Sequence, residues 1–125
     1  MTAVPAFASV TDALKLACAG LRFAAASDFA ALPDVVKAEC LHTYEQAASV
    51  LTAGRAWMLA AFTAGQGYSA DAEYSAGAWL RHRTTVTKAA ARAHVAWSRR
   101  AVAHPAVLAA QIGRASCRER VSCCV

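Results

Sequence analysis

The stretch PDVVKAECLHTYEQAASVLTAGRAWMLAAFTA, from Pro33 to Ala64, decides the fold of this chain. Its apolar and small side chains recur at alternating spacings of four and three residues, as on one helix face, and they define the predicted seam: Cys40, Tyr44, Ala47, Leu51, Gly54, Met58 and Ala61. Large and small side chains alternate along the seam, so a partner helix can approach closely at the small positions. We expect one helix of roughly 45 Å, covered along this seam by at least one other helix, because an isolated helix is marginal in water.

The composition of the whole chain favours the same kind of structure. The chain has 125 residues, which suits a single domain, and 34 of them are Ala whereas only 6 are Gly and 3 are Pro. Hydrophobic residues make up 58% and charged residues 17%, a balance that excludes a disordered chain. Since Ala has the highest helix propensity, we predict an all-α fold, a helical bundle with one long central helix.

Shorter helices are expected on both sides of the long one. The first is predicted from Ser9 to Ala26, where Ser9 and Asp12 resemble a capping pair. The long helix is expected to end at Gly65-Gln66-Gly67, because glycine commonly follows the last turn of a helix. Pro105 stops the last complete helix and can open a further one.

Two helices are expected in the C-terminal half. The first is predicted from Ala72 to His82, and the second begins with a Thr84 or Thr85 cap and continues to Ala103. The inward stripe of the second helix is predicted to be Val86, Ala90, Ala93, Trp97 and Ala101. A short helix, a turn of two or three residues and a basic helix also suit a helix-turn-helix arrangement.

Charge is distributed unevenly along the chain. Residues 1–73 hold four basic and seven acidic side chains, whereas residues 74–111 hold six basic and no acidic ones: Arg81, Arg83, Lys88, Arg92, Arg99 and Arg100. These six are our candidate DNA-binding residues, because phosphate contacts supply most non-specific affinity for nucleic acid. The alternative is a solvated helix face that keeps an Ala-rich protein soluble. Trp79 and Trp97 lie on apolar stripes, so we expect them in the core and not as platforms for bases.

The sequence contains no pattern typical of a catalytic, metal or cofactor site. Cys40 and His42 are two residues apart on a helix and point to different sides, which makes them a poor metal pair. His82 and His94 lie in different predicted helices and lack a nearby carboxylate in sequence, so we expect surface or capping residues there. Asp71 with Glu73 is expected to be a solvated cap of the following helix. No Ser-His-Asp order, phosphate-binding glycine loop or zinc-binding helix motif occurs. We therefore predict no catalytic residue, metal or cofactor in this chain.

The last fourteen residues differ in composition from the rest. Residues 112–125 contain three of the five Cys, the single Ile and only one Ala, and Ile112 to Val121 resembles the translated read-through of a sequencing adaptor. We interpret 112–125 as a non-native tail and 1–111 as the helical region. The N-terminus lacks the basic segment of a secretory signal, and no apolar run is long enough to span a bilayer, which predicts a cytoplasmic protein without membrane association.

Six segments, taken in order, resemble one known family: LRFAAASDFAALP (21–33), AECL (38–41), RAWMLAAFTAGQG (55–67), AWL (78–80), TKAA (87–90) and HP (104–105). Together they are similar to the N-terminal helical region of domain-of-unknown-function family 222, over about residues 14–111. That family is common in actinobacterial genomes and often continues into a C-terminal HNH endonuclease module. The module uses His and Asn around a divalent metal that activates water.

The resemblance implies a parent protein that cuts DNA, of which this chain is the truncated, non-catalytic N-terminal helical domain. It carries over no site residue, because the chain contains no Asn and ends before such a module would begin. We expect the helical domain to dock DNA or a partner through the six basic residues. The alternatives are a structural module that self-associates through the long helix, and a helix-turn-helix regulator that binds DNA sequence-selectively.

Overall fold

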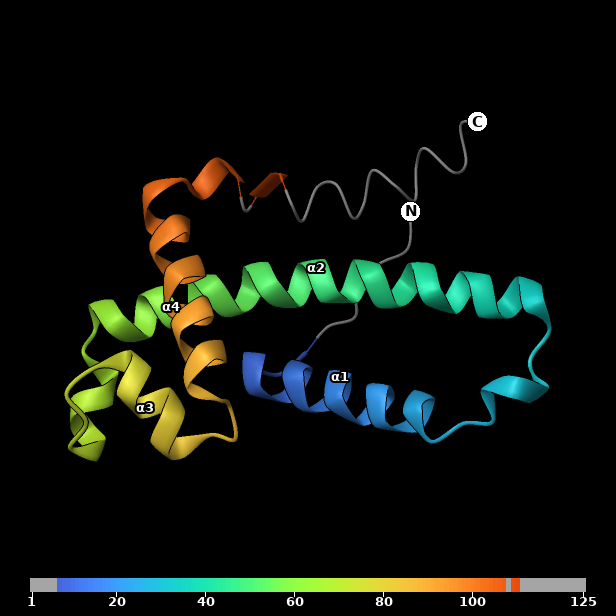
Figure 1. Ribbon diagram of the computed structural model, residues 1–125, viewed down its shortest axis with the longest axis horizontal. Coiled ribbons are helices and arrows are strands. Elements are labelled where there is room, and N and C mark those ends of the chain that lie inside the picture. Colours follow the sequence, from blue (N-terminus) through green and yellow to red (C-terminus); the bar gives the residue numbers. More distant parts are fainter. Residues whose placement is uncertain (1–6, 108, 111–125) are drawn as a thin grey trace. The chain divides into compact units, whose positions relative to one another are not determined.

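A computed structural model of the chain describes residues 7–107 and 109–110. Its α-helices are α1 (Val10–Ala25), α2 (Asp34–Ala64), α3 (Ala76–Arg83) and α4 (Lys88–Ala103), with short 3-10 helices η1 (Phe29–Ala31) and η2 (Gly67–Asp71) between them (Figure 1). Across these described ranges there is no strand, so the predicted all-α fold is confirmed. Helical conformation resumes at residues 105–107, as expected after His104. The expected non-native tail, 112–125, lies outside the described residues.

The chain divides into two compact units, Met1–Glu39 and Cys40–Val125. The first contains α1, η1 and the start of α2. The hydroxyl of Ser9 accepts a hydrogen bond from the Asp12 backbone N–H at 3.1 Å, which confirms the predicted cap. Within residues 7–39 no side chain is buried, and the large apolar residues of α1 are exposed, including Leu14 and Phe23.

The second unit has a small core built mainly from alanines. Ala53 and Ala56 of α2 contact Ala101 of α4, and the half-buried Trp97 packs against this cluster. Because alanine projects only one methyl group, the backbones of two helices can approach closely where alanines face each other. Leu59 extends the buried face of α2 by a further turn.

The predicted seam on α2 is the wrong face of the helix. Its large members are exposed: Tyr44 by 38%, Leu51 by 51% and Met58 by 55%. In an Ala-rich helix, spacings of three and four occur on more than one face, so periodicity alone cannot select among them. The buried face is the one with Ala53 and Ala56, which lie in a cluster with Ala101 against which Trp97 packs.

The long helix ends where predicted, but without a glycine in the left-handed conformation. Gln66 (φ 51°) and Ala72 (φ 60°) have positive φ, whereas none of the described glycines does. Gly67 is needed for a different reason, since a Cβ atom there would lie 2.5 Å from Cδ1 and Cε1 of Phe62. The absence of a side chain lets the backbone at the start of η2 lie against the Phe62 ring of α2.

Both C-terminal helices begin later than expected. The hydroxyl of Ser75 accepts from the Ala78 N–H at 3.1 Å and starts α3 at Ala76, because the left-handed Ala72 interrupts any helix begun there. Thr87 caps α4 in the same way, and Thr84 instead donates its hydroxyl to the Leu80 carbonyl at 2.6 Å.

The inward stripe predicted for α4 is confirmed in part. Ala101 is buried and Val86, Ala90 and Trp97 are half-buried, whereas Ala93 is exposed. The buried residues of α4 also include Ala91 and Ser98, which the stripe did not contain. Burial of Ser98 is compatible with an Ala-rich core because its hydroxyl donates to the Val95 carbonyl at 2.7 Å.

Candidate functional site

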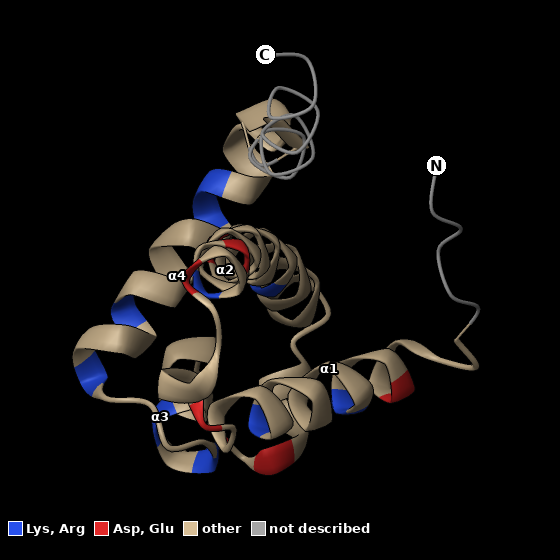
Figure 2. Cartoon of the chain, turned by 90° about the vertical axis from the view of Figure 1, so that its right-hand side faces the viewer, with Lys and Arg blue, Asp and Glu red and all other residues tan. Residues whose placement is uncertain are grey.

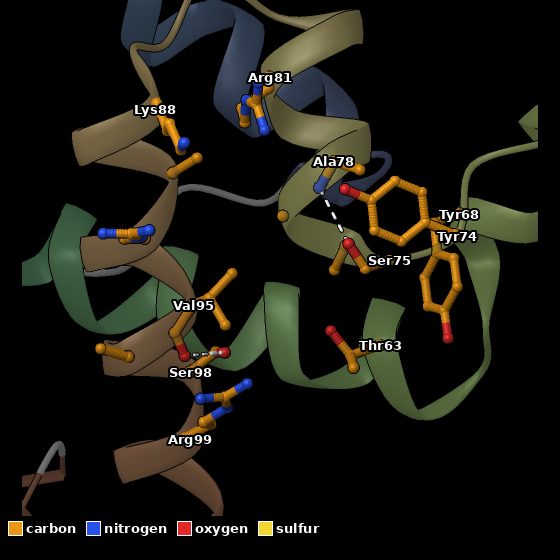
Figure 3. A pocket seen from close by; sticks show the side chains of 15 residues that line it. Thr63, Tyr68, Tyr74, Ser75, Ala78, Arg81, Lys88, Val95, Ser98 and Arg99 are labelled. Carbon is orange, nitrogen blue, oxygen red and sulfur yellow. Dashed lines mark hydrogen bonds between the residues drawn. The ribbon is translucent and has the colours of Figure 1, made fainter.

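A groove of about 720 Å³ lies in the second unit between α3 and α4 and reaches the end of α2 (Figure 3). We call it the basic groove, because four cationic side chains line it: Arg81, Lys88, Arg92 and Arg99. All four residues are exposed. Its size falls within the range of roughly 300–1,000 Å³ that is typical of ligand clefts.

The spacing along α4 explains how three of these charges come together. Lys88, Arg92 and Arg99 are separated by four and seven residues, which places them on one face of the helix. The exposed Arg81 joins them from the neighbouring helix α3. No acidic residue occurs within α4 (Figure 2), and none is among the described residues that line the groove, so the local charge is entirely positive.

The two other predicted binding residues have different roles. The Nη2 of Arg83 donates to the Asp71 backbone carbonyl at 2.9 Å, and its Nε lies 4.0 Å from the Glu73 carboxylate. Arg83 therefore helps to hold the connection before α3. The guanidinium of Arg100 lies 5.0 Å from the ring centroid of Trp97, a cation–π distance, and it does not line the groove.

The segment that leads into α3 is held by contacts that sequence reasoning missed. Nδ1 of His82 lies 3.0 Å from both carboxylate oxygens of Glu73, whose side chain is only 13% exposed. Nε1 of Trp79 donates to the Asp71 carboxylate at 2.8 Å. The expectation that Asp71 and Glu73 form only a solvated cap was wrong. The partners lie eight and nine residues apart, beyond the spacing of any helical pair.

Both tryptophans examined in the sequence have structural roles, as expected. Trp97 belongs to the periphery of the alanine core. The Trp79 ring lies against the Phe62 ring, with 4.8 Å between their centroids. The Tyr68 ring also contacts the Phe62 ring, edge-on, with 6.4 Å between their centroids. This aromatic cluster fixes the end of α2 relative to η2, and so positions the Tyr68 wall of the groove.

The residues that line the groove between its cationic and aromatic side chains are small and uncharged. Ala78 and Ser75 lie between its two sides in Figure 3, with Val95 and Ser98 projecting from α4. The hydroxyls of Ser75 and Ser98 are both used in local hydrogen bonds, to the Ala78 N–H and the Val95 carbonyl. Binding strength in the groove must therefore come from the cationic and aromatic side chains on its walls.

One histidine of α4 has a perturbed proton affinity. Burial, and secondarily the positive charge of Arg55 on α2, lower the pKa of the His94 imidazole from its ordinary value. Both causes disfavour the charged imidazolium. His94 does not line the groove.

Within residues 7–107 and 109–110 the structure contains neither a metal-binding cluster nor a membrane-spanning helix. No three His, Cys, Asp or Glu side chains there lie close enough together to hold a metal ion. None of the helices there has the length and apolar character required to cross a membrane. Cys18 and Cys40 are both free thiols.

Comparison with known proteins assigns neither a family nor a function to this chain. No protein-family model matches the sequence, and neither a curated protein nor a solved structure matches it. The resemblance to domain-of-unknown-function family 222 therefore stays a prediction based on the six quoted segments.

Proposed function

We propose that the chain is a cytoplasmic, non-catalytic helical module that docks on DNA through the basic groove. The observation that carries this proposal is the convergence of four cationic side chains, from two helices, on one groove without an acidic neighbour in its lining. A duplex presents closely spaced phosphates, and neutralising several of them at once releases condensed counterions. That release is the main source of sequence-independent affinity.

The arrangement also argues against a face that serves only solubility. Interspersed charges of both signs keep a surface soluble without accumulating repulsion. Here Arg81, Lys88, Arg92 and Arg99 concentrate one sign, which costs free energy in the unbound protein. Arginine forms bidentate hydrogen bonds with phosphate, and three of the four groove cations are arginines.

The resemblance to domain-of-unknown-function family 222 supports the same proposal from an independent direction. Members of that family often carry an HNH endonuclease module, and a DNA-docking region in the same chain would keep the substrate near the catalytic metal. In this proposal the chain supplies docking and the chemistry belongs to the parent protein. None of the groove residues is assigned a catalytic role.

The test is the salt dependence of duplex DNA binding by the full chain. If four cations contact phosphates, the logarithm of the association constant should fall with the logarithm of salt concentration with a slope of about −3.6. Replacing Lys88, Arg92 and Arg99 together by Gln should reduce the slope to about −0.9 and leave the helical circular dichroism signal unchanged.

A matched control removes the same charge elsewhere. Arg114, Arg118 and Arg120 lie outside the described residues, and their replacement by Gln should change the slope much less than the groove substitutions do. A flat salt response of the unmodified chain, or equal losses from the two triple variants, would refute docking through the groove. Strong preference for one DNA sequence would instead favour the helix-turn-helix regulator, for which α3, a four-residue connection and α4 are available.

Self-association through α2 is a second candidate function, favoured by the exposure of the predicted seam. Tyr44, Leu51 and Met58 alternate with small residues along it, an arrangement that fits a second helix. Light scattering should then detect a defined oligomer that Leu51→Glu with Met58→Glu dissociates. The oligomer should persist in the groove variant. A monomer at every accessible concentration would exclude this function.

A further inference from the structure

The basic groove has two chemically different sides. Lys88 and Arg99 project from α4 on one side, and Tyr68 and Tyr74 lie on the opposite side (Figure 3). The groove thus offers cations to one edge of an occupant and aromatic rings to the other. Duplex docking requires only the cations, so the tyrosine side is left unexplained by phosphate contacts.

The two tyrosines differ in how firmly they are held. Tyr68 is half-buried, and its ring rests edge-on against Phe62 at 6.4 Å. Tyr74 is 80% exposed, although it stands at the groove and directly precedes the Ser75 cap of α3. A large aromatic side chain exposed to this extent gains free energy when another flat apolar surface covers it.

A nucleobase is such a surface, but only when it is unpaired. In a duplex each base face is already stacked on its neighbours, so a protein ring can reach it only after unstacking. In a single strand the faces are accessible, and a charged groove with aromatic side chains is the usual arrangement for holding one. The cations then track the backbone while the rings receive the bases.

We propose that the basic groove binds single-stranded nucleic acid, with the phosphates along the α4 cations and one or more bases stacked on Tyr74 and Tyr68. This inference rests on the proposed docking function and adds the class of substrate. It assigns base stacking to Tyr74. The sequence did not suggest this role, because the neighbouring residues Glu73 and Ser75 belong to no nucleic-acid-binding motif.

The test compares three probes of equal length with the full chain at one salt concentration: an oligothymidine, the same phosphodiester strand without bases, and a duplex. Fluorescence anisotropy should show the oligothymidine binding about tenfold more tightly than the baseless strand, which carries the same charge. Tyr74→Leu should reduce this difference severalfold, because only Tyr68 then remains for stacking, without weakening binding of the baseless strand. Tyr74→Phe should preserve it, because the ring remains.

Phe23→Leu serves as the matched control. Phe23 is an aromatic residue of α1 that is 79% exposed and does not line the groove, and its replacement should leave all three affinities unchanged. Circular dichroism checks that each variant folds, which is expected for a side chain as exposed as Tyr74.

The outcomes separate the two levels of the proposal. Equal affinity for the base-bearing and baseless strands, or an unchanged preference in Tyr74→Leu, would overturn the single-strand inference while leaving phosphate docking intact. No binding to any probe would overturn both. A phosphorylated peptide that displaces the oligothymidine at equal charge concentration would show that the groove recognises anions without regard to bases, and would also overturn the inference.

Discussion

Replacing Gly67 by Ala tests how tightly the end of α2 packs against η2. The added Cβ atom would lie 2.5 Å from two carbons of the Phe62 ring, well inside van der Waals contact. That ring cannot easily move away, because it contacts Trp79 at 4.8 Å and Tyr68 at 6.4 Å between centroids. Trp79 is itself held by its hydrogen bond to Asp71.

The expected magnitude follows from two opposing terms. Inserting a methyl group into a packed site of this kind costs about 1–3 kcal/mol. Replacing glycine restricts the unfolded chain and returns about 0.4–1 kcal/mol. The Gly67→Ala variant should therefore have a free energy of unfolding about 1–2 kcal/mol lower than the unmodified chain, which corresponds to a Tm lower by several degrees.

Gly54→Ala is the matched control. A Cβ atom at Gly54, in the middle of α2, would meet nothing within 4 Å. With no steric cost, the variant should be more stable by about 0.5–1 kcal/mol, because alanine favours the helix. Urea unfolding followed by far-ultraviolet circular dichroism measures both variants. The reasoning about the aromatic cluster fails if Gly67→Ala is stabilising or neutral under conditions where Gly54→Ala is stabilising.

Two further predictions concern the second unit. Ala53→Leu should lower the free energy of unfolding by about 1–3 kcal/mol, because Ala53 is fully buried against Ala101 and Trp97. Leu51→Ala, at a half-exposed position, should lower the free energy of unfolding by less than about 1 kcal/mol. If urea unfolding shows a larger loss for Leu51→Ala than for Ala53→Leu, the predicted seam is the packed face after all. The lowered pKa of His94 means that the unfolded chain takes up this proton at higher pH than the folded chain does. Stability should therefore fall as the pH decreases through about 6.5, and His94→Gln should lose less stability over that interval; identical pH profiles would contradict the assignment.

The positions of the cationic residues could be predicted from the sequence, but their division into roles could not. Lys88, Arg92 and Arg99 share a helix face by spacing alone, and the structure gathers them in the groove as that spacing predicts. Arg83 and Arg100 are equally basic neighbours in sequence. Their partners are known only from the structure. Arg83 contacts Glu73 and the Asp71 carbonyl, and Arg100 lies over the Trp97 ring.

Local chemistry in the sequence determined the helices. Alanine content and the Ser9 cap are properties of the chain that need no distant partner, so the all-α class and the extent of α1 and α2 followed from them. The late start of α3 depends on the left-handed backbone at Ala72. The sequence gives no sign of that conformation, because alanine seldom adopts it.

Only the tertiary structure decided which faces of those helices meet and what surface results. Alanine fits on any side of a helix, so an Ala-rich α2 carries several acceptable apolar stripes, and the packing of α4 at Ala53 and Ala56 selects one. The same packing leaves Tyr44, Leu51 and Met58 exposed. Placement of Tyr74 opposite the α4 cations likewise requires α3 and α4 to pack together. Contacts between residues so far apart in the chain depend on how well the surfaces of two helices fit together, and no short stretch of sequence shows that fit.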